Sequence, residues 1–317
     1  MAHIAVIGAV NLDIGAAART ELRLRDSNIG AVHTGFGGVG RNIAHDLCLM
    51  GEEVSLITLF GNDDFARAIR SHAETIGMDL SQSLVLDDAR TSSYIYLSEP
   101  SGDMFAAVND MDIYERLTPD FLAERMELIN ACELAVVDCN IPAESILYLA
   151  KNCRIPLLAD PVSVAKASRL KEALPYLTLL KPNRYEAELL SGIAIENEED
   201  VRTAAKALLA AGLRRVCISL SEQGIYLLDE SGEEVREHLP SGFTVRNTTG
   251  CGDSMTAALA FAMAEGLTLQ EAAKAAIRAA ALTAASEETI SPELNRNVIL
   301  NSGDCKSQIF YNDRERS

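Results

Sequence analysis

Asp253 has the sequence surroundings best suited to chemistry. It follows two glycines in the stretch NTTGCGDSMTAA at 247–258, at the mouth of an alanine-rich helical pattern. The glycines allow a tight turn whose N–H groups point into one cavity, and the helix dipole adds positive potential there. The sequence predicts an anion hole at Gly250, Cys251 and Gly252, beside a carboxylate that takes a proton from an attacking hydroxyl group. An ordinary Asp N-cap would explain Asp253 but not the flanking glycines.

A second glycine-rich stretch, GFGGVGRN at 35–42, could hold a ligand close to the backbone. Its glycines formally satisfy the dinucleotide pattern GxGxxG: Gly35, Gly37 and Gly40. That pattern should directly follow the first strand, which ends near Gly8, so the position argues against it. Gly37 and Gly38 instead allow close backbone approach, and Asn42 lies in the first turn of the following helix. The alternatives are a plain glycine hinge, or a nicotinamide-dependent oxidoreductase that uses GFGGVG, with the acid expected after the next strand present in TLFGNDD.

A third stretch, LKPNRYEAELL at 179–189, opens another helix. Asn183 followed by Glu186 has the spacing of a capping box, in which each side chain satisfies the backbone N–H of the other. The functional interpretation places Glu186 near a hydrated Mg²⁺ and Asn183 near phosphate oxygens. The two interpretations are compatible, because a capped helix start at the ligand-binding edge suits both.

Short apolar runs alternate with helical patterns along the chain, and this alternation must position the three stretches. Continuous apolar strands joined by helices predict a mostly parallel sheet covered on both faces, with ligands at the carboxyl ends of its strands. The expected strands are 4–8, 54–60, 134–140, 155–160, 177–183 and 214–221, and the clearest helices are 41–51 and 63–77.

Two segments, 13–36 and 91–109, show no helical pattern. The second reads as a β-hairpin with a turn at EPSGD. We expect these segments to form a small β lid that closes over substrate. The expected core is 1–12, 37–90 and 110–303, and a C-terminal tail follows at 304–317.

The chain of 317 residues is strongly acidic, with 46 Asp and Glu against 28 Lys and Arg and a formal net charge of -18. Such a surface repels phosphate backbones, which argues against nucleic acids and anionic membranes as partners. A polyanionic substrate must then be bound locally, by a divalent metal ion or by backbone N–H groups.

The seven cysteines are scattered and form no CxxC motif, which is typical of reduced thiols in a cytoplasmic protein. The stretch MAHIAVIGAVNLD reads as a strand and not as a signal peptide. No apolar run reaches about 18 residues, so the sequence predicts no membrane span.

The motifs GGVGRN, LKPNRYEAE and NTTGCGD occur in this order, and together they resemble the ribokinase-like carbohydrate kinases, the PfkB family, over about residues 3–300. The resemblance implies a three-layer α/β/α sandwich with a mostly parallel central sheet and a small β-sheet lid. It also implies ATP and Mg²⁺ as cofactors. Neither GxxxxGK[ST] nor the HRD and DFG motifs occur, which excludes Walker-type NTPases and protein kinases.

DSN at 26–28, NDM at 109–111 and DCN at 138–140 are similar to one subgroup of this family. That subgroup transfers the γ-phosphate of ATP to the 5′-hydroxyl of the nucleoside pseudouridine. Another ribose-type acceptor, such as ribose, adenosine, inosine or uridine, is the alternative within the family. A nucleoside sensor without catalysis is a further alternative, although the intact Asp253 and glycines argue against it.

The resemblance assigns roles at the acceptor end of the site. Asp253 is similar to the family's catalytic base, and residues 250–252 to its anion hole. The residues similar to sugar and nucleoside contacts are Asn11, Asp13, Gly37, Gly38, Asn42, Asn109 and Asn140. The lids of such kinases often complete dimers, which makes a homodimer through the lid an expectation here.

At the nucleotide end, Asn183 and Glu186 resemble the pair that contacts the nucleotide and, through water, the metal ion. The residues placed for ATP phosphates and ribose are Ser219, Ser221 and Gly224. Three positions depart from the family pattern: Ser221 replaces a frequent Gly, Cys251 replaces Ala, and Asn247 replaces Asp. Only the N–H of Cys251 is needed, but the missing carboxylate at 247 argues against activation by K⁺.

Overall fold

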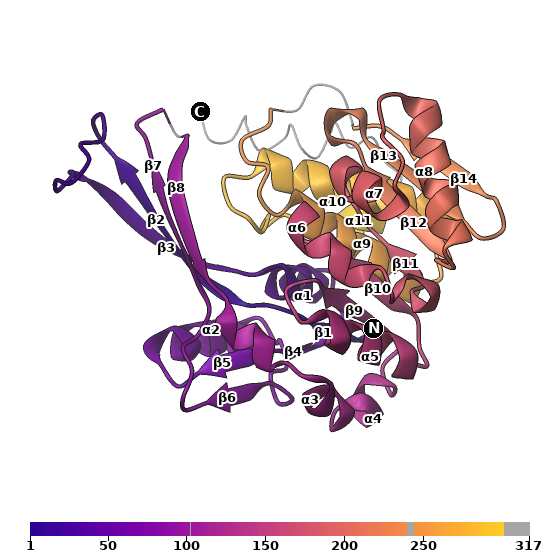
Figure 1. Ribbon diagram of the computed structural model, residues 1–317, viewed down its shortest axis with the longest axis horizontal. Coiled ribbons are helices and arrows are strands. Elements are labelled where there is room, and N and C mark those ends of the chain that lie inside the picture. Colours follow the sequence, from indigo (N-terminus) through magenta and orange to yellow (C-terminus); the bar gives the residue numbers. More distant parts are fainter. Residues whose placement is uncertain (102, 240–243, 301–317) are drawn as a thin grey trace.

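The main body of the protein is an eight-stranded sheet between two layers of helices (Figure 1). The computed structural model describes residues 1–101, 103–239 and 244–300. The strand order is β14-β13-β12-β11-β10-β9-β1-β4. In chain order these strands are β1 (His3–Ile7), β4 (Glu53–Ile57), β9 (Leu134–Asp138), β10 (Leu157–Asp160), β11 (Leu179–Leu180), β12 (Arg215–Ser219), β13 (Ile225–Asp229) and β14 (Glu234–Glu237).

The strands from β4 to β12 in this order pair in parallel, and β13 and β14 add an antiparallel edge. Alternate residues of β1 enter different cores: Ile4 and Val6 pack on one face of the sheet, and Ala5 and Ile7 on the other. Burial on both faces explains why these strands read as continuous apolar runs. The predicted mostly parallel α/β sheet is therefore confirmed.

The helices divide between the two faces according to the core that they join. On the face of Ile4 lie α1 (Val39–Leu49), α2 (Asp64–Thr75), α9 (Cys251–Ala264), α10 (Leu269–Ala285) and α11 (Arg296–Leu300). On the face of Ile7 lie α3 (Pro119–Ala123), α4 (Met126–Ile129), α5 (Ala143–Asn152), α7 (Arg184–Ser191) and α8 (Glu198–Ala210).

A separate four-stranded sheet stands away from the body (Figure 1). Its order is β3-β2-β7-β8, made of β2 (Asn11–Ala18), β3 (Gly30–Gly37), β7 (Ser93–Ser98) and β8 (Met104–Asp110). The hairpin predicted in the second irregular segment is present as β7 and β8. The sheet starts at Asn11, inside the expected core segment 1–12, and its closure over substrate stays a prediction.

One predicted strand was wrong in detail, and one feature of the large sheet was not predicted. The expected strand 54–60 is divided at Thr58: β4 stays in the large sheet, and β5 (Leu59–Gly61) pairs with β6 (Leu84–Leu86). Both parts are buried, so the apolar pattern runs through the division. The antiparallel edge β13–β14 was not predicted.

The expected tail 304–317 lies outside the described residues. Within the part of the chain that the structure describes, no helix has the length and apolar character needed to span a bilayer.

Candidate active site

The three motif stretches meet at the carboxyl edge of the large sheet. Asp138 and Asp160 are the last residues of β9 and β10, and Lys181 directly follows β11. The helices α1, α7 and α9 begin at GGVGRN, KPNRYEAE and TGCGD. Open α/β sheets bind ligands at this edge.

The dinucleotide interpretation of GFGGVG does not fit the topology. α1 follows β3, a strand of the small sheet, whereas a dinucleotide loop joins a central parallel strand to its helix. The N-cap of α1 is Gly38, with φ of 95°. A Cβ atom there would lie 2.4 Å from the carbonyl oxygen of Ala9, so the position requires glycine.

The alanine-rich pattern predicts a helix that begins after Asp253, at Ser254, but α9 begins three residues earlier. The helix starts at Cys251, so Gly252 and Asp253 lie in its first turn instead of preceding it. Gly250 is the N-cap, with φ of 85°, and a Cβ atom there would lie 2.2 Å from the carbonyl oxygen of Thr289. No side chain caps the helix, so the interpretation of Asp253 as an N-cap was wrong.

The backbone N–H groups at this entrance are mostly free. Cys251 N–H donates to the carbonyl oxygen of Thr248 over a long 3.4 Å. The N–H groups of Gly250, Gly252 and Asp253 have no acceptor among the described residues. Of the three predicted amides, those of Gly250 and Gly252 are therefore available to an anion, and Asp253 offers a further one.

The side chain of Asp253 is half-buried and is held from α1. Asn42 Nδ2 donates a hydrogen bond of 2.7 Å to Asp253 Oδ2. Burial and the nearby Asp160 carboxylate together raise the pKa of Asp253 to about 7, while Asn42 and Lys181 oppose the shift. A carboxyl group with a pKa near neutrality is well placed to accept a proton.

Beside Asp253 lies a buried ion pair that the sequence analysis missed. Lys181 Nζ is 3.2 Å from Asp160 Oδ2, which also accepts a hydrogen bond of 2.7 Å from Thr256 Oγ1 of α9. Burial alone would lower the pKa of Lys181, but Asp160, Glu186 and Asp253 together raise it above its ordinary value. Lys181 Nζ thus lies against the first turn of α9, where a Cβ atom at Gly252 would be 3.1 Å from it.

Asp138, also missed, ties three loops together at the same edge. Its Oδ2 accepts from Ala9 N at 2.9 Å and from Gly40 N at 2.7 Å, and its Oδ1 accepts from Asn140 N at 2.8 Å. Gly8 makes room for this carboxylate, because a Cβ atom there would lie 2.4 Å from Asp138 Oδ2.

Asn11 and Asp13 lie on β2, where the small sheet joins the body. Ser92 Oγ donates to Asn11 Oδ1 at 2.9 Å. Gly37 makes room for Asp13, since a Cβ atom at 37 would lie 2.1 Å from Asp13 Oδ2. Asp13 Oδ1 is buried without a partner among the described residues, and burial raises the pKa of Asp13 to about 6. An unpaired buried oxygen of this kind fits a ligand hydroxyl group.

The two asparagines expected at the nucleoside lie in different surroundings. Asn140 is buried and its Oδ1 accepts from Lys166 Nζ at 2.5 Å. Asn109 is exposed on β8, opposite Tyr94 of β7. The structure therefore brings Asn140 to the sheet edge, whereas Asn109 lies on the small sheet.

The capping box at α7 is present. Asn183 Oδ1 accepts from Glu186 N at 3.0 Å, and Glu186 Oε2 accepts from Asn183 N at 2.8 Å. Burial raises the pKa of Glu186. Its Oε1 has no partner among the described residues.

Glu186 Oε1 is the atom that decides whether this site can hold a Mg²⁺ ion. Among the described residues no cluster of three or more His, Cys, Asp or Glu side chains is arranged for a metal ion. Mg²⁺ bound to a nucleotide keeps several water ligands and needs only one or two carboxylates, so Glu186 fits such an ion.

The segment after β12 contains Ser221, one of the positions that depart from the pattern of the kinases that the sequence resembles. Ser221 has φ of 53°, in the left-handed region where Gly is favoured. Gly224 has φ of 87°, and a Cβ atom there would lie 2.1 Å from the carbonyl oxygen of Glu237. Ser219, the last residue of β12, forms a parallel bridge with Asn183. The three residues expected at the nucleotide thus follow one strand end beside α7.

Asn247 supports the turn before α9 through its amide group. Its Oδ1 accepts from Thr249 N at 2.9 Å, and its Nδ2 donates to the carbonyl oxygen of Glu287 at 3.4 Å. The amide occupies hydrogen-bonding positions in this turn, while the negative charge typical of the family is missing.

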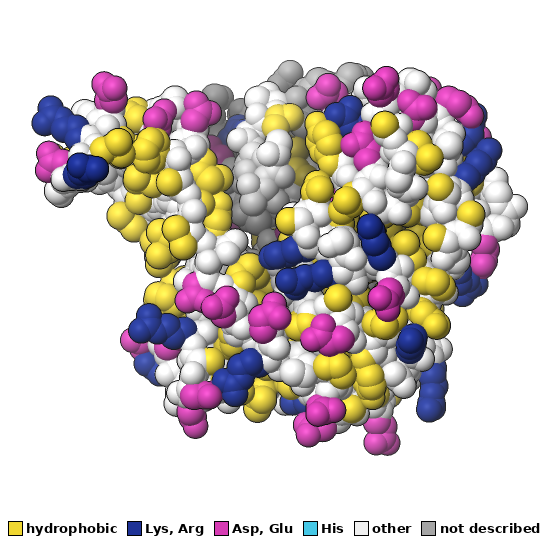
Figure 2. All heavy atoms as spheres, viewed as in Figure 1, with side chains coloured by type: hydrophobic (Ala, Val, Ile, Leu, Met, Phe, Trp, Pro, Cys, Tyr) yellow, Lys and Arg dark blue, Asp and Glu magenta, His cyan; other side chains and the backbone are white. Residues whose placement is uncertain are grey.

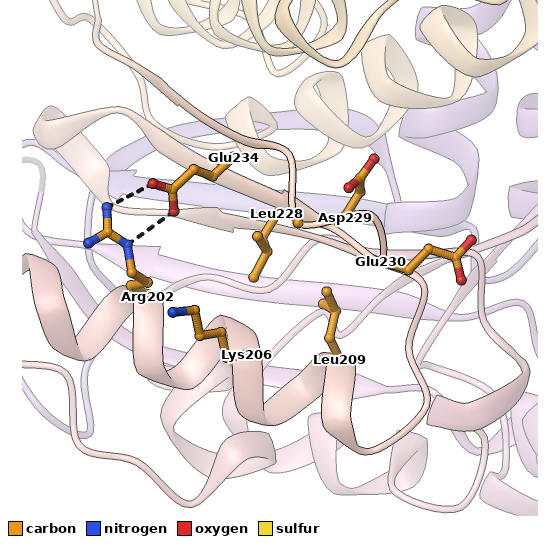
Figure 3. Close-up of a pocket in the computed structure, with 8 residues that line it drawn as sticks. Arg202, Lys206, Leu209, Leu228, Asp229, Glu230 and Glu234 are labelled. Atoms are coloured by element: carbon orange, nitrogen blue, oxygen red, sulfur yellow. Dashed lines mark hydrogen bonds and ion pairs between the residues drawn. The ribbon is translucent and has the colours of Figure 1, made fainter.

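An open groove of about 520 Å³ lies elsewhere, between α8 and the β13–β14 edge (Figure 3). Its floor includes Leu209 and Leu228, and Arg202 forms a two-point ion pair with Glu234 at 2.9 and 3.0 Å. The groove reaches Asp229 of β13, which lies opposite Arg215, the first residue of β12, in the antiparallel pairing of the two strands. The groove therefore lies near the amino-terminal end of β12, whereas Ser219 and the candidate site lie at its carboxyl end.

Comparisons with known proteins agree with this geometry. The model of the pfkB family carbohydrate kinases matches residues 1–296. A pseudouridine kinase of Escherichia coli K12 is 35% identical over 299 residues, which cover 94% of this chain and 95% of that protein.

Solved structures show the same fold. A carbohydrate kinase from Agrobacterium tumefaciens matches with a TM-score of 0.84 and 30% identity, over 94% of this chain and 96% of that one. An Arabidopsis thaliana ribokinase complexed with ribose and ATP matches with a TM-score of 0.83 and 20% identity, over 94% and 97% of the two chains. The predicted ribokinase-like fold is confirmed. The chain therefore belongs to the pfkB family of carbohydrate kinases.

Proposed function

We propose that the protein transfers the γ-phosphate of ATP to the 5′-hydroxyl of pseudouridine, giving pseudouridine 5′-phosphate. The observation that carries the proposal is the α9 entrance, where free N–H groups and the Asp253 carboxylate share one helix turn. The similarity to a pseudouridine kinase over 94% of the chain supports the choice of acceptor.

In this proposal Asp253 acts as general base. Its pKa near 7 allows a large ionised fraction at neutral pH, and Asn42 fixes the carboxylate through Oδ2. The carboxylate then accepts the proton of the 5′-hydroxyl as that oxygen attacks the γ-phosphorus in line, while the bond from the γ-phosphorus to the bridging oxygen breaks and ADP leaves.

The backbone groups take the charge that develops on the transferred phosphoryl group. The free N–H groups of Gly250, Gly252 and Asp253 donate to its oxygens, and the dipole of α9 adds to their effect. A Mg²⁺ ion near Glu186 would supply further charge neutralisation when it is bound with the nucleotide.

The two substrates occupy neighbouring parts of the sheet edge. We place the ribose against Asn11, Asp13 and Asn42, with Gly37 and Gly38 allowing it to approach the backbone. ATP lies beyond α9, along Asn183 and the segment 219–224. The small sheet, about 13–36 and 91–109, closes over the acceptor, with Asn109 on its β8 strand.

The small sheet also supports a homodimer as part of the proposal. Strands β3 and β8 are exposed over most of their length, and Figure 2 shows hydrophobic side chains gathered over this sheet. A second copy of the chain would cover this apolar surface. A cytoplasmic location is likewise proposed, and the free thiols of the six cysteines in the described ranges support it.

A different ribose-type acceptor is the second candidate, because the residues at the ribose end are defined better than those at the base end. A panel of pseudouridine, uridine, ribose and adenosine, each with MgATP, separates the candidates through ADP release. We expect the largest kcat/KM with pseudouridine. A larger kcat/KM for ribose or adenosine would overturn the proposed substrate but leave the kinase assignment intact.

A further inference from the structure

Lys166 lies at the sheet edge and has no role in the chemistry described so far. It belongs to the short helix α6 (Val164–Ala167), on the side of the body that faces the small sheet (Figure 1). Its Nζ donates to Asn140 Oδ1 at 2.5 Å and lies 3.5 Å from Met111 Sδ. Met111 directly follows β8, so Lys166 joins the sheet edge to the base of the small sheet.

The charge of Lys166 is not neutralised by a close carboxylate. Within the described ranges no Asp or Glu forms an ion pair with this half-buried side chain, and its closest acceptor is a neutral amide. An ammonium group has three N–H donors, and the bond to Asn140 together with the weak sulfur contact leaves at least one free. Burial lowers the pKa of Lys166, although Asp138 nearby raises it.

The surrounding loop holds Lys166 in this position at a conformational cost. Val162 has φ of 66°, a conformation that β-branched residues rarely adopt. Its N–H donates to Asp160 Oδ1 at 2.8 Å, which fixes the turn from β10 into α6. Strained residues of this kind cluster at ligand sites, where the rest of the structure compensates for the strain.

Asn140 is fixed from its other side as well. Arg169 Nη1 donates to the backbone carbonyl oxygens of Asn140 and Ile141 at 3.1 and 2.8 Å, and Asp138 accepts from Asn140 N. Asn140 thus holds the ammonium group of Lys166 with little freedom. A preorganised ammonium group that still has an unused N–H selects a ligand group that accepts hydrogen bonds.

We propose that Lys166, held by Asn140, determines acceptor specificity by donating a hydrogen bond to a carbonyl oxygen of the nucleobase. This inference rests on the proposed function and adds to it the recognition of the base. A pyrimidine-dione base carries two carbonyl oxygens, whereas adenine carries none, and free ribose offers no base at all. Lys166 therefore favours nucleosides of the uracil type over adenosine and ribose.

The test uses the full chain and compares Lys166→Met with Lys171→Met, a control that removes an exposed lysine nearby. Pseudouridine and ribose affinities are measured by calorimetry, and kcat and the KM for ATP by ADP release. We expect Lys166→Met to raise the Kd for pseudouridine about 10- to 100-fold, because a charge-assisted hydrogen bond is lost. The Kd for ribose and the KM for ATP should change less than about twofold, and the control should match the wild type. Lys166→Arg should recover part of the lost affinity.

Three outcomes would overturn the inference. An unchanged Kd for pseudouridine in Lys166→Met refutes it, and so does an equal loss for ribose and pseudouridine, which would indicate a merely structural role. Both leave the proposed kinase reaction intact if the wild type phosphorylates pseudouridine. A wild-type protein that neither binds nor phosphorylates pseudouridine refutes the proposed substrate and this inference together. If Lys166→Met does not fold, Lys166→Gln replaces it, with the same comparison of the two ligands.

Discussion

The carboxyl edge of the large sheet and the small sheet beside it are built in opposite ways. At the edge, Asp138, Asp160 and Lys181 are all buried and find their partners within the chain. In the small sheet, Val32 and Val108 are 71% and 72% exposed. The edge is preorganised by the fold, whereas the small sheet leaves apolar surface that a closed substrate complex or a second subunit would cover.

From this contrast we propose that the chemical step takes place at the edge, and that the small sheet serves closure and assembly. Substitutions at the edge should therefore affect kcat strongly, and exposed positions of the small sheet should affect association while kcat stays nearly constant.

Asp253→Asn gives the largest expected loss. The amide keeps the shape of the side chain but cannot accept the hydroxyl proton, so kcat should fall about 10³-fold. Calorimetry of pseudouridine and ATP should show binding within about threefold of the wild type. A kcat close to that of the wild type would remove Asp253 from the chemistry and end the assignment of that step to the edge.

The pH dependence of kcat should follow the titration of Asp253, with a smaller effect than the Asp253→Asn substitution. The folded pKa of Asp253 is raised to about 7, so the base is protonated and inactive below that pH and ionised above it. We expect kcat to be roughly tenfold lower at pH 6 than its value on the alkaline plateau. A profile that is flat between pH 5.5 and 8 would contradict the role of Asp253 as base.

The raised pKa of Asp253 should also make the stability of the fold depend on pH. The sign of this dependence is opposite to that of a salt-bridged carboxylate, whose pKa is lowered by folding. Because the folded pKa lies above the unfolded one, the folded state binds more protons, and this contribution to stability is lost as the pH rises from about 4 to about 7. Asp253→Asn should therefore raise the Tm relative to the wild type at pH 8 more than at pH 5. Thermal unfolding at the two pH values measures this difference, and an equal change at both would contradict the raised pKa.

Val108→Ser should give the smallest effect on catalysis. Val108 is exposed, so the Tm should change by about 1 °C or less and kcat by less than twofold. Sedimentation should show a weaker dimer, because the substitution removes apolar surface from the proposed interface. An unchanged dimer, or a monomer already in the wild type, would contradict assembly through this part of the small sheet.

The parts of the site that the sequence predicted are those with a local pattern. The capping box at Asn183 and Glu186 and the glycine turn before Asp253 depend on residues a few positions apart, so their spacing was enough. The parallel sheet was predictable for a similar reason, since burial on both faces leaves continuous apolar runs.

The missed residues depend on contacts between distant segments. Asp138 joins the loops at 9, 40 and 140, and Lys181 pairs with Asp160, yet each is a single polar residue at the end of an apolar strand. A charged residue that ends a buried strand or directly follows it was the available signal. The division at Thr58 left no signal, because both β4 and β5 are buried.

The most direct test of the central claim is a crystal structure of the protein with pseudouridine, MgADP and aluminium fluoride, a mimic of the transferred phosphoryl group. We expect fluoride atoms within hydrogen-bonding distance of the Gly252 and Asp253 N–H groups, with the 5′-oxygen next to the Asp253 carboxylate. A mimic bound away from the first turn of α9, or a 5′-oxygen out of reach of Asp253, would contradict it.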